Sequence, residues 1–161
     1  RKVVSLALKC APDNLDVIRT AITLSSVEDQ DALSLLRKLQ DDEVRLLTIA
    51  THSKATNRPA LLSETLRLIA LSSQGVKFAI RIKALCELAT MIVADTTKCS
   101  SARRWRELLG MTLEASQNPE DDPVTTNAMR YIIRLTMDHY LHDSEHKNEC
   151  DEDYVKIPMI A

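Results

Sequence analysis

Glycine occurs only twice in this chain of 161 residues, at Gly75 and Gly110. Sheet proteins depend on tight turns, and glycine is the residue that most readily adopts the backbone angles of those turns. The alternation of β-branched and polar residues that marks strands is missing as well. The chain is therefore predicted to be all-α, because helices can be joined by short loops that need few glycines.

Apolar residues recur every three to four positions along most of the chain, which is the spacing of one face of a helix. The most apolar segment, residues 78–95, carries apolar side chains over more than half of the helical circumference and is predicted to be the most buried helix. Further helices are predicted at residues 2–10, 29–39 and 43–52, and from Asp13 or Asn14, Pro59, Ser100 or Ser101, and Val124. Seven to eight helices in antiparallel hairpins predict a compact bundle or a segment of an α-solenoid.

The periodicity also divides the chain into two parts. Residues 1–141 are predicted to form one helical domain, whereas residues 142–161 are predicted to be an acidic, partly frayed C-terminal segment without clear apolar periodicity. The chain begins with Arg-Lys-Val-Val rather than with Met, and we interpret it as a fragment of a larger protein.

The charge balance and the cysteines narrow the class of protein. A net charge of −2 and a pI near 6.1 provide no overall attraction to nucleic acid or to an anionic bilayer. No apolar run approaches the roughly 18 residues of a membrane-spanning helix. The four cysteines are scattered without a C-x-x-C pair, so the sequence indicates neither a disulfide framework nor a zinc ribbon. These features predict a cytoplasmic or nuclear location.

Residues 138–150 contain three of the four histidines and one of the four cysteines. On a helix, His142 and His146 lie one turn apart, so this pair could share a zinc ion if another helix supplied further ligands. In the metal-binding motif H-E-x-x-H the glutamate directly follows the first histidine, whereas here Glu145 lies late in the pair. An ordinary polar helix margin is the favoured interpretation, and a metal pair and a pH-responsive contact are the alternatives.

A basic cluster surrounds the single tryptophan. Arg103, Arg104 and Arg106 flank Trp105, a combination that could hold phosphates while the indole ring stacks on a base. Trp105 is also in helical register with Leu108, however, which places the indole in the core. In that case the arginines remain on a solvated surface, where they could bind a protein partner.

Catalytic signatures are missing from the sequence. It has no G-x-S-x-G turn, no glycine-rich phosphate loop and no recognisable cysteine–histidine arrangement, so we predict that the chain is not an enzyme and needs no cofactor. The leading hypothesis is a non-catalytic protein–protein interaction module, part of a larger scaffold or adaptor, with the three arginines as a contact surface. The alternative is a nucleic-acid-associated regulatory domain that uses the arginines for phosphates and the pair of histidines for zinc. The sequence does not predict the oligomeric state.

Overall fold

The computed structural model describes residues 2–25, 30–95, 98–117 and 123–145. Within these ranges the chain forms α-helices and one short 3₁₀ helix, and it forms no strand, so the all-α prediction is confirmed. The elements are α1 (Lys2–Cys10), α2 (Leu15–Leu24), α3 (Gln30–Leu36), η1 (Arg37–Leu39), α4 (Glu43–Ala55), α5 (Pro59–Leu71), α6 (Phe78–Ala94), α7 (Lys98–Ser116) and α8 (Pro123–Glu145).

Short polar side chains fix the starts of two helices. The Oδ1 atom of Asn14 accepts hydrogen bonds from the backbone N–H groups of Asp16 (3.0 Å) and Val17 (3.1 Å), and this caps α2. The Oδ1 atom of Asp42 accepts a 3.0 Å hydrogen bond from the backbone N–H of Arg45, and this caps α4. Both caps fall where the sequence predicts a helix to begin.

Two predicted boundaries are wrong. The helix predicted at residues 43–52 continues to Ala55, because His52, Ser53 and Lys54 extend the helical hydrogen bonding instead of starting a linker. Helix α7 already begins at Lys98, so Ser100 and Ser101 lie inside it and neither is its N-cap.

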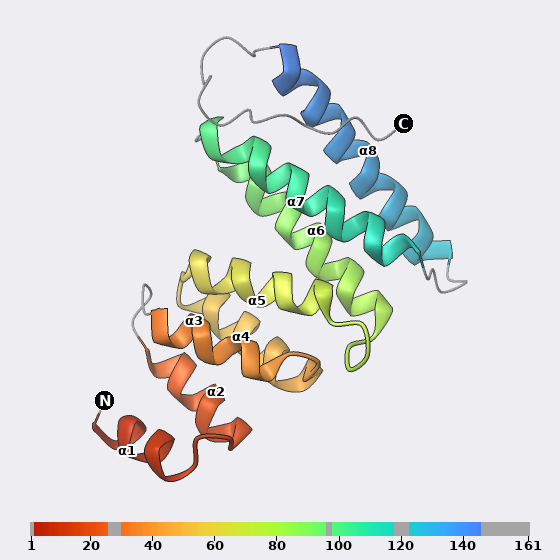
Figure 1. Ribbon diagram of the computed structural model, residues 1–161. Coiled ribbons are helices and arrows are strands. Elements are labelled where there is room, and N and C mark those ends of the chain that lie inside the picture. Colours follow the sequence, from red (N-terminus) through yellow and green to blue (C-terminus); the bar gives the residue numbers. More distant parts are fainter. Residues whose placement is uncertain (1, 26–29, 96–97, 118–122, 146–161) are drawn as a thin grey trace.

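The helices form an elongated stack that runs from α1 and α2 at one end to α7 and α8 at the other (Figure 1). Each helix packs mainly on its neighbours along the chain. In addition, α3, α5 and α7 contact one another in sequence, and α2 packs on α4 and α6 on α8. The result is an all-helical arrangement with many helix–helix contacts.

Helix α6 provides the largest share of the core, as its apolar sequence predicts. Its inner residues touch α5, α7 and α8. Burying a large aliphatic or aromatic side chain contributes about 1.5–3 kcal/mol relative to leaving it exposed, so this helix anchors the stack. The buried residues of α6 are Phe78, Ile82, Ala84, Leu85, Leu88, Ala89 and Ile92.

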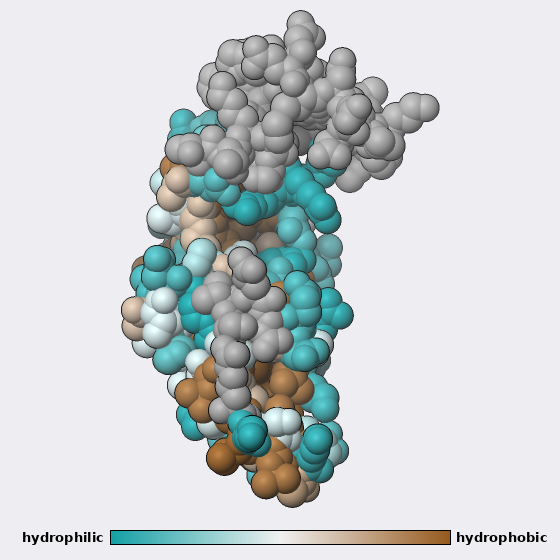
Figure 2. Space-filling view, turned by 90° about the vertical axis from the view of Figure 1, so that its left-hand side faces the viewer, coloured by the Kyte–Doolittle hydropathy of each residue, from teal (hydrophilic) through white to brown (hydrophobic). Residues whose placement is uncertain are grey.

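Apolar side chains are exposed to solvent at the N-terminal end of the stack. Helix α1 contains no buried residue, and its Val3 and Leu6 side chains are exposed. Figure 2 shows hydrophobic residues gathering at this end of the molecule. Helix α1 is therefore held to α2 by partly buried side chains such as Leu8.

Two loops meet closely beside the start of α6. The backbone N–H of Asp41 donates a 3.2 Å hydrogen bond to the Ser72 hydroxyl, and the N–H of Lys77 donates a 2.8 Å hydrogen bond to the Glu43 carboxylate. Asp41 itself has a φ of 66°. A Cβ atom placed on Gly75 would lie 1.7 Å from the carbonyl oxygen of Asp41, so only glycine fits this crossing.

A buried arginine joins α2 to α5. Arg58 immediately precedes α5 and is 5% exposed. Its Nη1 atom donates to the carbonyl oxygens of Ile22 and Thr23 (3.3 Å each), and its Nη2 atom donates to the Ser25 hydroxyl at 3.1 Å. The guanidinium group thus satisfies carbonyls at the C-terminus of α2, where a positive charge is favourable.

Candidate functional site

A groove opens between α4 and α6, with α5 as its floor. It encloses a volume of about 190 Å³. The walls are close at one end, where the Lys54 ammonium of α4 lies 4.0 Å from the Glu87 carboxylate of α6. The groove is lined by Leu47, Ala50, Thr51, Lys54, Leu66, Ile69, Ile80, Lys83, Ala84 and Glu87.

The groove has an apolar interior and a charged rim. Leu66 and Ile69 form the floor, while Lys54, Lys83 and Glu87 supply all the charges among the lining residues. Pockets for cofactors and other small molecules usually enclose about 300–1,000 Å³, which is more than this groove offers. Its volume suits one or two apolar side chains of a larger binding partner.

An apolar line on α4 extends the groove. Val44 and Leu47 belong to the apolar pattern of this helix, yet Val44 is 72% exposed and Leu47 is 38% exposed. The reason is that α4 turns its Leu46, Ile49 and Ala50 positions toward the core. The two exposed side chains leave apolar surface beside the groove, next to Thr51.

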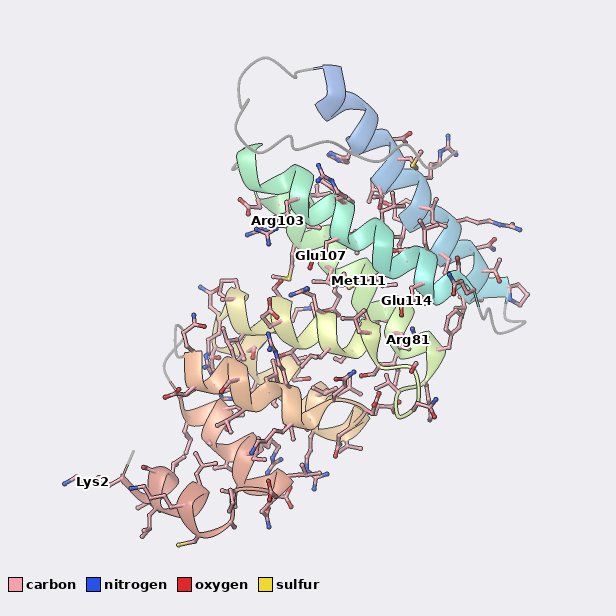
Figure 3. The ribbon with its side chains drawn as sticks, viewed as in Figure 1. Lys2, Arg81, Arg103, Glu107, Met111 and Glu114 are labelled. Carbon is pink, nitrogen blue, oxygen red and sulfur yellow. The ribbon has the colours of Figure 1, made fainter. Side chains whose placement is uncertain are left out.

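The three arginines of α7 do not share one face. Arg104 forms an ion pair with Asp95, the C-cap residue that follows α6. Figure 3 shows Arg103 with Glu107 on the side of α7 that faces α5, and Glu107 pairs there with Arg67 of α5. All three arginines are exposed, and the contact surface predicted for them stays a prediction.

Trp105 belongs to the core. It is 2% exposed, and its ring lies 4.7 Å from the imidazole of His139 on α8, with an angle of 14° between the two planes. The stack contributes to the contact between α7 and α8 and covers one face of the indole. The core position that the register of Trp105 predicts is therefore confirmed.

The buried indole leads to a test with nucleic acid. Trp105 is the only tryptophan, so intrinsic tryptophan fluorescence reports on this site alone. We expect single-stranded oligonucleotides to leave the emission unchanged, because no base can stack on a ring that is already covered. Unfolding in guanidinium provides the positive control, since it should shift the emission to longer wavelength. Saturable, salt-sensitive quenching by an oligonucleotide would contradict the expectation.

Two described cysteines should differ in reactivity. Cys10 is exposed at the end of α1, whereas Cys86 is partly buried on α6. Burial raises the pKa of the Cys86 thiol, and the neighbouring Glu87 carboxylate raises it further, so less thiolate is present near neutral pH. We expect iodoacetamide at pH 7.5 to modify Cys10 before Cys86, as read by peptide mass mapping. Equal rates in the folded chain would show that α6 opens readily.

The candidate metal pair lies outside the described side chains. The side chain of His142 and the whole of His146 are not among the described residues. Where side chains are described, no three His, Cys, Asp or Glu residues converge on a common point that could hold a metal ion. The zinc hypothesis for His142 and His146 stays a prediction. The division of the chain at residue 142 stays a prediction as well.

Of the described helices, none combines the length and the apolar character needed to cross a bilayer. In comparisons with protein-family models, curated proteins and solved structures, no family, protein or structure matches the chain.

Proposed function

We propose that the chain is a non-catalytic helical module that binds a partner protein through its outer surface, as part of a scaffold or adaptor. The observation that carries this proposal is the α4–α6 groove, whose apolar interior is open to solvent and smaller than a typical cofactor pocket. Exposed Val44 and Leu47 enlarge the apolar surface around it. A small apolar hollow with charged residues at its rim can receive an anchoring side chain of a partner protein.

The architecture supports the same proposal. Stacked helices present the outer faces of alternate helices side by side, and such surfaces serve as binding faces in α-solenoid proteins. The exposed Arg103 and Arg106 of α7 are a second candidate contact surface. The nucleic-acid alternative draws less support, because Trp105 is buried against His139 and Arg104 is paired with Asp95.

The proposal predicts direct, stoichiometric binding to another protein. The tagged chain is used to capture proteins from a cell extract, and each candidate is then purified and mixed with the chain in analytical ultracentrifugation. We expect at least one candidate to form a complex of defined stoichiometry without chemical change to either component. If no purified candidate binds, or if the chain converts a candidate into a product, the proposal is overturned.

A further inference from the structure

We propose that the α4–α6 groove binds an amphipathic α-helix of the partner, one that carries carboxylates beside its apolar residues. This inference rests on the proposed function and specifies the partner chemistry of the same site. Three features carry it: the small residues that keep the groove open, the apolar line along α4, and the charges at the rim.

Small side chains on both walls leave the hollow open. Ala50 of α4 and Ala84 of α6 line it on either side of Leu66 and Ile69. All four of these residues are buried within the fold, so the inner surface of the groove is apolar. A single large aliphatic or aromatic side chain entering from outside would fill this space and remove its own surface from water.

The outward side of α4 gives the direction of the occupant. Val44, Leu47 and Thr51 lie on successive turns of the outward side of α4, and the first and the last are separated by about 10 Å at a rise of 1.5 Å per residue. A helix laid along α4 and α6 presents apolar residues at i and i+7 with the same spacing. One residue would contact Val44 and Leu47 while the other enters the groove.

The rim gives the charge of the occupant. Lys54 and Lys83 outnumber the single Glu87 among the lining residues. Lys83 is exposed, and no ion pair to it is found in the described part of the chain. The ion pair of exposed Lys54 with half-buried Glu87, at 4.0 Å, contributes little and can be replaced by a carboxylate of the partner. Acidic residues on the partner would complement the rim, whereas basic ones would be repelled.

A peptide selection tests the inference without assuming the partner. A phage library of random peptides, long enough for about four helical turns, is selected against the intact chain. We expect the selected sequences to share apolar residues at i and i+7 with Asp or Glu beside them. Synthetic versions should bind in fluorescence anisotropy and gain helical circular dichroism when bound.

Two threonines of α4 provide a matched pair of variants. Thr51 lines the groove and Thr48 does not, yet both are exposed and both donate to the carbonyl oxygen one turn earlier (2.9 Å and 2.8 Å). Thr51→Phe should fill the groove and weaken peptide binding at least about tenfold. Thr48→Phe should leave binding unchanged. Circular dichroism of both variants serves as the control for correct folding.

The charge of the rim and the apolar side chains of α4 are each tested by a variant and a matched control variant. Lys83→Glu should weaken the acidic peptides at low salt and less so at high salt, whereas Lys9→Glu on α1 should not. Val44→Asp should weaken binding, while Val124→Asp should not. Both valines are the second residue of their helices, at 72% and 76% exposure.

The outcomes separate this inference from the proposed function. Selected peptides that bind Thr51→Phe as well as the parent, or that ignore Lys83→Glu, overturn the acidic-helix inference. So does a selection that returns only basic peptides, or none. A purified partner protein that binds both threonine variants equally would retain the interaction module but place its site elsewhere. If neither peptides nor proteins bind, both proposals fall.

Discussion

Replacing Gly75 by alanine is expected to lower the free energy of unfolding by about 3 kcal/mol, at the upper end of the range for overpacked sites. The new Cβ atom would stand 1.7 Å from the carbonyl oxygen and 2.6 Å from the carbonyl carbon of Asp41, and both belong to backbone. The two loops must therefore separate, which also strains the hydrogen bond from Asp41 to Ser72. Thermal unfolding followed by circular dichroism should show a melting temperature lower by roughly 6–12 °C.

The other glycine is the control for this experiment. Gly110 lies inside α7 on an exposed surface, and a Cβ atom there would meet no atom within 4 Å. Gly110→Ala should stabilise the chain by about 0.5–1 kcal/mol, because alanine restricts the unfolded chain and favours helix. Opposite signs for the two variants are the expected result. If Gly75→Ala unfolds like the parent, the two loops do not cross as described.

Replacing Arg58 by methionine is expected to lower the free energy of unfolding by about 2–3 kcal/mol. Methionine keeps the length of the buried stem but removes the donors to the Ile22 and Thr23 carbonyls and to the Ser25 hydroxyl. The C-terminus of α2 then loses its hydrogen bonds to the guanidinium group, although Ser25 still donates to the Ile22 carbonyl. Arg58→Lys should recover only part of the loss, because an ammonium group cannot reproduce the planar fork of the guanidinium.

Urea denaturation of the variants measures this difference. Arg130→Met on the exposed surface of α8 is the matched control and should change the free energy of unfolding by less than about 0.5 kcal/mol. A loss at Arg130 as large as at Arg58 would mean that the effect comes from charge and not from the hydrogen bonds. An unchanged Arg58→Met variant would show that α2 and α5 are not joined in this way.

Local chemistry explains why much of the fold is predictable from the sequence. The caps at Asn14 and Asp42 depend on a side chain and on backbone groups two or three residues away, so they can be recognised without a structure. Pro59 likewise marks the first turn of α5. The apolar periodicity of residues 78–95 is strong enough to identify α6 as the central helix.

The features that depend on distant residues were missed. Arg58 falls in a polar stretch that reads as an ordinary linker, because its partners lie 33 to 36 positions earlier in the chain. Gly75 reads as a simple break, and its reason is the carbonyl of Asp41 in another loop. Val44 and Leu47 fit an apolar stripe, yet only the packing of α4 shows that this stripe is turned outward.

The candidate site illustrates the same limit. Its two walls, α4 and α6, are separated in sequence by the whole of α5, and nothing in either segment signals that Lys54 and Glu87 will meet. The sequence indicated the arginine cluster around Trp105 and the pair of histidines as candidate sites instead. Of these, Arg104 and Trp105 serve the fold, and the histidine pair lies outside the described side chains.

Each helix packs mainly on its neighbours along the chain, so the helices can unfold in stages instead of all at once. Unfolding of α1 would expose the surface of α2 that it covers and would leave the packing of α7 and α8 unchanged. The only indole sits in α7, so fluorescence would register the last stage of such unravelling and miss the first. Amide hydrogen exchange, read helix by helix, would instead reveal a gradient of protection that rises from α1 toward α6.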